Sequence, residues 1–224
     1  MAALADVLVV MAKYPALGEV KTRLAERVGA DAARALFAAF LADISARFAR
    51  SPRRLVWAVT PAGADLTAFI GAGQTQIPQA GDGLAERMQR CFARLLRDGT
   101  ERVVMIGADA PHIGDAAIDA AFAALDDHDA VFVPTRDGGY CLVGMRAPHD
   151  IFSGVAMGTS AVFEQTCARL DALGLRWRAL ETSFDVDEVG DVATLADLID
   201  RDTVSLPRTR AVLLNWKTTG LLTG

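Results

Sequence analysis

The stretch RVVMIGADAPH, residues 102–112, decides which fold the chain adopts. Its apolar, mostly β-branched residues 103–106 are typical of a buried strand, which ends at Gly107 in a turn that carries Asp109. Asp109 is therefore expected at the carboxyl end of a strand, the edge of an open α/β sheet where ligands bind. A carboxylate on a short turn suits Mg²⁺ or Mn²⁺. The alternative is that Asp109 only closes the turn or caps a helix that begins near Asp115.

On both sides of this stretch, strand and helix patterns alternate along the chain. Short apolar runs predict strands at 7–12, 55–60, 130–134, 140–145 and, as a candidate, 176–180. Helical spacing of apolar residues predicts helices that include a short one at 64–70 and longer ones at 31–48, 84–96, 115–125, 160–173 and 192–199. Five residues separate the strands at 130–134 and 140–145, too few for a parallel crossover, so this pair should be antiparallel in a mixed α/β sheet.

Length and composition restrict the class of protein. The chain has 224 residues, enough for one large α/β domain, which we place at residues 1–202. Residues 203–224 form an extension whose apolar patch, 211–216, could be an added strand or an interface segment, which suggests a homodimer. A net charge of −5 argues against nucleic acid or an anionic membrane as the main partner. No apolar run is long enough to span a membrane.

Cysteine usage indicates the compartment. Cys91, Cys141 and Cys167 are odd in number and show no CxxC spacing, so neither a zinc site nor a disulfide framework is indicated. We expect them to be reduced, in or near the core of a cytoplasmic protein.

The loop after the first predicted strand is basic. Lys13, Lys21 and Arg23 lie within eleven positions, and Gly18 lies between them. Such side chains and backbone N–H groups could hold a pyrophosphate, although neither a Walker A loop nor a dinucleotide fingerprint is present. The alternative is a solvated basic loop.

The turn RDGGY, residues 136–140, follows the strand at 130–134. Gly138 and Gly139 beside Asp137 permit close backbone approach to a ligand, and the strand should bring Asp137 and Tyr140 to the same edge as Asp109. A plain hairpin turn explains Asp-Gly equally well.

Two further segments carry candidate residues. Of Asp185 and Asp187, we expect one to face a metal and the other to cap a helix or meet solvent, with Asp191 capping the helix at 192–199. Thr159 and Ser160 are cap candidates for the helix at 160–173, and the amino end of that helix could also receive an anion.

The order of these motifs resembles a known family. The segments KYPALGEVKTRL, QAGDGLAERM, GADAP, RDGGYCLVG, MGTS and FDVDEVGD, spread over about residues 7–198, are similar to the bacterial GT-A-like glycosyltransferases, also called radical-SAM/selenodomain-associated transferases. The more distant resemblance is to 2-phospholactate and molybdenum-cofactor guanylyltransferases. This resemblance implies the nucleotide-diphospho-sugar transferase (GT-A-like) fold, with a mixed, mainly parallel sheet in three α/β/α layers.

The resemblance also implies roles for the candidate residues. Asp109 would bind the divalent cation together with a late acidic residue, Asp187 or else Asp185. Lys13, Lys21 and Arg23 would meet the phosphates of a nucleotide. The usual D-x-D of glycosyltransferases is reduced here to GADA, with one carboxylate.

The sequence thus predicts a Mg²⁺- or Mn²⁺-dependent transferase with a nucleotide-activated donor, most simply a nucleotide-sugar glycosyltransferase with an unknown acceptor. Asp109 and Asp187 would hold the metal, and Asp137 would act as base or orient the acceptor. Gly138, Gly139, Tyr140 and Thr159 would join the basic loop in binding substrate. The alternatives are a guanylyltransferase-like nucleotidyltransferase that acts on a phosphorylated small molecule and a non-catalytic nucleotide-binding module.

Overall fold

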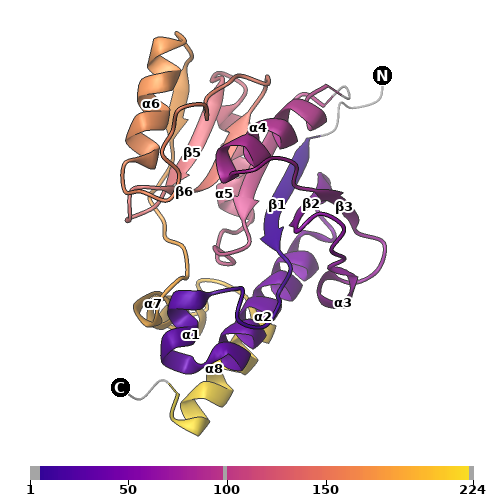
Figure 1. Ribbon diagram of the computed structural model, residues 1–224, viewed down its shortest axis with the longest axis vertical. Coiled ribbons are helices and arrows are strands. Elements are labelled where there is room, and N and C mark those ends of the chain that lie inside the picture. Colours follow the sequence, from indigo (N-terminus) through magenta and orange to yellow (C-terminus); the bar gives the residue numbers. More distant parts are fainter. Residues whose placement is uncertain (1–5, 98–99, 222–224) are drawn as a thin grey trace.

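The computed structural model describes residues 6–97 and 100–221 (Figure 1). Its strands form one seven-stranded sheet in the order β3-β2-β1-β4-β6-β5-β7. The strands are β1 Val7–Lys13, β2 Arg54–Thr60, β3 Thr75–Pro78, β4 Val103–Gly107, β5 Ala130–Pro134, β6 Tyr140–Met145 and β7 Trp177–Ala179. Among them β6 runs antiparallel to its neighbours β4 and β5, and the other pairs are parallel. The predicted mixed sheet, including the antiparallel pair, is confirmed.

Helices cover both faces of the sheet, as the three-layer prediction requires. The helices are α1 Thr22–Val28, α2 Ala30–Phe48, α3 Thr67–Ile70, α4 Leu84–Leu95, α5 Asp115–Ala124, α6 Val162–Ala172, α7 Val189–Asp200 and α8 Pro207–Thr219. Along β1, Leu8 and Val10 join a core cluster with α2, α5, α7 and α8, whereas Val7 and Val9 join a second cluster with α4 and α6. Alternate residues of β1 are therefore buried on opposite faces, which explains its uninterrupted apolar run.

Several element boundaries differ from the prediction. Helix α1 lies in what was expected to be a continuous loop, and its buried Leu24 and Val28 have the helical spacing that marks it. Strand β3 has one buried residue, Ile77, and is too short to show a pattern. Helix α2 begins at Ala30, so Asp31 lies in its first turn rather than at its cap.

The carboxyl-terminal segment, for which the sequence left an added strand or an interface segment open, is a helix and not a strand. Helix α8 packs beside α2, with Leu213 and Trp216 buried between them and the rest of the core (Figure 1). The carboxylate of Asp43 on α2 is 3% exposed and accepts N–H groups of Arg208 and Thr209 at 3.1 and 2.8 Å. These bonds satisfy amides that the first turn of α8 leaves unpaired.

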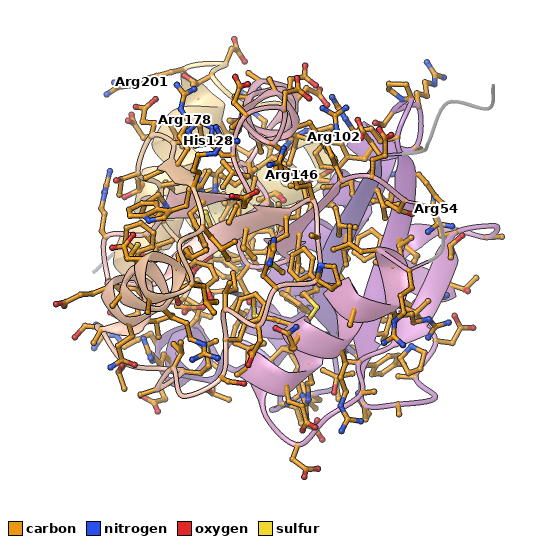
Figure 2. All side chains as sticks on the ribbon, turned by 90° about the horizontal axis from the view of Figure 1, so that it is seen from above. Arg54, Arg102, His128, Arg146, Arg178 and Arg201 are labelled. Carbon is orange, nitrogen blue, oxygen red and sulfur yellow. The ribbon has the colours of Figure 1, made fainter. Side chains whose placement is uncertain are left out.

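Basic side chains gather at the edge of the sheet where β2 and β4 begin, and Figure 2 labels Arg54, Arg102 and Arg146 among them. Because β6 is antiparallel, its end lies at this same edge. Arg102 forms a bidentate pair with Asp6, at 2.8 and 2.9 Å, and Arg146 contacts Asp129 at 2.7 Å. The charges of Arg102 and Arg146 are therefore paired with carboxylates of the protein itself. None of the described helices has the length and hydropathy needed to cross a membrane.

Candidate active site

A cleft of about 620 Å³ opens at the opposite edge of the sheet, where β1, β2 and β4 end and β6 begins. This is the edge at which the sequence predicts that a ligand binds. Most of the predicted site residues line the cleft, namely Lys13, Arg23, Asp109, Asp137, Gly139, Tyr140, Thr159 and Asp187. Lys21 lines an adjoining pocket of about 280 Å³, and Gly138 lies behind the cleft wall.

An extended segment after β7 brings distant carboxylates to Asp109. The N–H of Ser183 donates to the carbonyl of Pro134 at 2.8 Å, so the segment continues alongside the end of β5. Further on, the N–H of Val186 donates to the backbone carbonyl of Asp109 at 3.0 Å. Asp185 and Asp187 therefore flank the turn after β4, although more than seventy positions separate them from it in the chain.

Asp185 and Asp187 face the same cleft, so the prediction that they diverge is wrong. Residues two apart in an extended segment share a face, and Val186 between them is fully buried on the other. Asp191 does not occupy the cap position that the sequence predicted, because α7 begins at Val189 with Glu188 as its cap. Asp191 lies in the first turn as the third residue of a capping box, where it accepts the N–H groups of Asp187 and Glu188 at 3.0 and 2.8 Å. Burial and the adjacent charges of Asp109 and Asp187 raise the pKa of Asp185 to about 7.

Lys21 lies between two of these carboxylates. Its Nζ contacts Oδ1 of Asp109 and lies 3.0 Å from Oδ1 of Asp187. The lysine side chain is 2% exposed, whereas those of Asp109 and Asp187 are 47% and 44% exposed. The two charges raise the pKa of Lys21 above its usual value despite the opposing effect of burial. Lys21 therefore points inward, at the carboxylates, and not into the open cleft as a ligand for phosphate.

Lys13 and Arg23 are placed as the sequence predicted. The ammonium of Lys13 donates to the carbonyl of Glu19 at 2.8 Å, and its side chain is 44% exposed. The guanidinium of Arg23 is paired loosely with Glu188, at 3.5 Å, and its side chain is 70% exposed. Both long side chains line the cleft and can turn toward an anion at low cost, because surface ion pairs of this kind are weak.

The chemistry of the carboxylates fits a divalent cation. Asp109 and Asp187 offer hard oxygen atoms that converge on one positive charge, and Asp185 lies beside them. Among the residues that the structure describes, no three His, Cys, Asp or Glu side chains are already arranged around a metal position. The fold therefore brings together Asp109 and Asp187, the pair predicted from the sequence. The Lys21 ammonium lies between their carboxylate oxygens.

The DGG turn is held rigidly against the loop before α6. Oδ1 of Asp137 accepts the hydroxyl of Thr135 at 2.5 Å and the N–H of Gly139 at 3.2 Å. Gly138 has φ +90°, and a Cβ there would lie 1.9 Å from the carbonyl oxygen of Ser160. The carbonyl of Gly138 also accepts the N–H of Phe163, at 2.9 Å. Gly138 thus allows two loops to pack closely, which is a different role from contact with the ligand.

Tyr140 and Thr159 both line the cleft. The Tyr140 ring packs edge-on against Phe132, with centroids 5.2 Å apart, and burial raises the pKa of its hydroxyl to about 12. Thr159 does not cap α6 in the expected way, because that helix begins at Val162 and has Ala161 at its cap position. The Thr159 hydroxyl instead donates to the carbonyl of Ala156 at 2.9 Å, within its own turn.

The structure adds two residues that sequence reasoning missed, both from the QAGDGLAERM segment. Gln79 lies 9% exposed in the cleft wall, where its Nε2 donates to the carbonyls of Ala12 and Ala58 at 3.2 and 2.8 Å. Arg87 on α4 donates to the carbonyl of Gly81 at 3.0 Å. The position of Gln79 directly after a strand would have been the signal, but β3 is too short to be predicted from the sequence.

Comparison with known proteins agrees with this architecture. A phosphoenolpyruvate guanylyltransferase of Sphaerobacter thermophilus is 31% identical over 183 residues, which cover 80% of this chain and 88% of that protein. The crystal structure of a protein from Desulfovibrio desulfuricans G20, assigned as a nucleotide-diphospho-sugar transferase, superposes with a TM-score of 0.88. It is 32% identical and covers 97% of this chain and 96% of its own.

A second solved structure shows the fold alone. CMP:2-keto-3-deoxy-manno-octonic acid synthetase complexed with CTP has a TM-score of 0.57 and 12% identity, and covers 88% of this chain and 99% of its own. The predicted nucleotide-diphospho-sugar transferase fold and the predicted class of enzyme, a transferase, are therefore confirmed. Nothing in these comparisons bears on an association with radical-SAM proteins. A family model described as "Uncharacterized protein conserved in bacteria (DUF2064)" matches residues 42–159, more than half of the chain, which therefore belongs to the DUF2064 family.

Proposed function

We propose that this protein is a nucleotidyltransferase that transfers a guanylyl group from GTP to a phosphorylated small acid. The observation that carries the proposal is the cleft itself, in which basic side chains stand opposite converging carboxylates at the ends of β1 and β4. The guanylyltransferase relative supports the choice of guanylyl transfer and a phosphorylated acid as acceptor.

The cleft residues have separate tasks in this proposal. Lys13 and Arg23, whose side chains are exposed, bind the β- and γ-phosphates of GTP. An oxygen of the acceptor attacks the α-phosphorus, the bond from that phosphorus to the bridging oxygen breaks, and pyrophosphate leaves. Asp137, held in its turn by Thr135 and Gly139, orients the acceptor.

Asp109 and Asp187, with Asp185 beside them, would hold Mg²⁺ or Mn²⁺. A divalent cation bound there would neutralise negative charge on the reacting phosphates. The carboxylates need no large backbone movement for this, because the hydrogen bond from Val186 to Asp109 already fixes the two segments side by side.

Transfer of a sugar from a nucleotide-sugar is the second candidate, and was the first expectation from the sequence. The Desulfovibrio desulfuricans protein, whose assigned class is nucleotide-diphospho-sugar transferase, favours it. It ranks second because the relative with a defined reaction is a guanylyltransferase and because the GADA turn carries one carboxylate where glycosyltransferases carry D-x-D. A non-catalytic module finds no support, since the relatives are transferases.

Calorimetric titration with GTP, CTP, UDP and GDP, each with and without Mn²⁺, tests the proposal. We expect GTP to bind best and only with metal, and pyrophosphate to be released when phosphoenolpyruvate is added. Preferential binding of a nucleoside diphosphate, with no pyrophosphate from any triphosphate, would favour sugar transfer instead.

Asp109→Asn tests the metal assignment. We expect pyrophosphate release to fall by roughly 10²-fold or more, because one of the two principal carboxylates is lost, while the far-ultraviolet circular dichroism spectrum stays unchanged. Asp127→Asn is the matched control, since it removes one carboxylate charge from an exposed position outside the cleft. An Asp109→Asn protein with full, metal-dependent activity would refute the assignment.

A further inference from the structure

Lys21 differs from the other basic residues of the first loop. Its ammonium is buried beneath the carboxylates of Asp109 and Asp187, and it also lies over the rings of Phe37 and Phe40, 5.7 and 5.9 Å from their centroids. Lys13 and Arg23 in the same loop are exposed and contact neither carboxylate. The proposed reaction assigns no role to the buried Lys21 ammonium in the free protein.

We propose that the Lys21 ammonium stands in for the divalent cation in the free protein and leaves its place when the metal binds. The ammonium contacts one oxygen of each carboxylate, at the point where the two groups converge. A cation is most stable at that point, so the lysine and the metal compete for it. The inference rests on the proposed function, because it takes Asp109 and Asp187 as the metal-binding pair.

The backbone at Lys21 supports a role beyond packing. Lys21 has φ 51° and ψ 46°, a left-handed conformation that is unfavourable for a residue with a side chain. The residue stands at the junction of the loop with α1, and its carbonyl accepts the N–H of Ala25 at 2.8 Å as that helix begins. The strained conformation is retained where it directs the ammonium back to the two carboxylates.

A pocket beside Lys21 can accommodate the ammonium when it leaves the carboxylates. Lys21 lines the pocket of about 280 Å³ together with Lys13 and Arg23, and Asp109 and Asp187 form its other wall. A short rotation of the lysine side chain takes the ammonium from the carboxylates toward these two basic residues. There it joins the groups that bind phosphate, so that entry of the metal prepares the cleft for the nucleotide.

Binding of Mn²⁺ without nucleotide, followed by electron paramagnetic resonance, tests this competition. We expect Lys21→Met to bind Mn²⁺ roughly tenfold more tightly than the parent protein, because the competing charge is gone. Lys13→Met is the matched control. It removes the same charge from the same cleft without a direct contact, and we expect less than about a threefold change because solvent screens the exposed group. Equal or weaker Mn²⁺ binding by Lys21→Met would overturn the inference.

Chemical labelling of the parent protein provides a second test that does not depend on the folding of a variant. The chain has three lysines, and Lys13 and Lys217 are exposed internal references. With an amine-acetylating reagent and mass spectrometry, we expect Lys21 to be protected without metal and to become reactive when Mn²⁺ alone is added. Continued protection of Lys21, although Mn²⁺ is shown to bind, would overturn the inference and leave the proposed function intact. Failure of Mn²⁺ to bind either protein, with or without GTP, would overturn both.

Discussion

At the scale of single residues, burial keeps the His112 side chain uncharged near neutral pH. His112, at the end of the turn that carries Asp109, is 8% exposed and stacks on Phe184 with ring centroids 4.1 Å apart. Its Nε2 lies 2.9 Å from the hydroxyl of Ser183. Burial, together with the charge of Arg47, lowers the pKa of His112 to about 4. The imidazole is thus neutral in the folded protein, and it fastens the segment that supplies Asp185 to the turn of Asp109.

Stability should consequently depend on pH through His112. Between pH 6.5 and pH 4 the unfolded chain binds a proton at this histidine and the folded chain does not, so acidification favours unfolding. We expect this group to remove about 2 kcal/mol of the free energy of unfolding between pH 7.5 and pH 5. Urea unfolding of the parent protein and His112→Gln at both pH values measures it, because other groups, Asp185 included, cancel in the comparison. An identical loss in the two proteins would contradict this expectation.

At the scale of elements, the cleft depends on loops that pack against one another. The DGG turn between β5 and β6 contacts the loop before α6 through Gly138 and Ser160, and Asp137 is fixed by the same turn. Such a contact needs a residue without Cβ. The position of Asp137 in the cleft therefore depends on a glycine that does not line it.

Gly138→Ala should show this dependence. Its Cβ would meet the Ser160 carbonyl at 1.9 Å, in a backbone conformation with φ +90°, and we expect a loss of about 3 kcal/mol in the free energy of unfolding. Gly154→Ala is the control, because that glycine has a similar φ, +80°, but nothing within 4 Å of the added Cβ, so about 1 kcal/mol is expected. Thermal and urea unfolding measure both, and equal losses would show that the contact with Ser160 is unimportant.

At the scale of the whole molecule, the carboxyl-terminal helix completes the core on one face of the sheet. Trp216 of α8 is 2% exposed, and the first turn of α8 is tied to the buried Asp43 of α2. The helix lies along α2 (Figure 1). Other side chains of α2 pack in the same core cluster as β1, and Phe37 of α2 lies next to the Lys21 ammonium. The core that supports the cleft therefore includes a segment that the sequence pattern set apart from the transferase domain.

Trp216→Ala should destabilise the protein by about 3 to 5 kcal/mol, because a fully packed aromatic side chain is replaced by a cavity. Leu214→Ala is the matched control in the same helix, since Leu214 is 51% exposed and its removal should cost less than about 1 kcal/mol. Urea unfolding provides the measurement. Similarly small losses in the free energy of unfolding for both variants would mean that the packing of α8 contributes little to stability.

Local patterns in the sequence determined the sheet and the edge at which the cleft opens. The apolar run at 103–106 predicted β4, the short link at 135–139 predicted the antiparallel β5–β6 pair, and Asp109 was placed correctly at the end of its strand. These features depend on residues a few positions apart, and their periodicity and turn chemistry are visible along the chain. The weak elements, β3 and α1, were missed because they are short and have few buried residues.

Only the tertiary structure decided how distant charges meet. The sequence showed three basic residues in one loop, but not that Lys21 turns inward to Asp109 and Asp187 while Lys13 and Arg23 remain exposed. It showed two aspartates at 185 and 187, but not the hydrogen bond from Val186 to Asp109 that turns both to the cleft. Contacts of this kind join segments up to 166 positions apart, and they form only when the sheet and its helices bring those segments together.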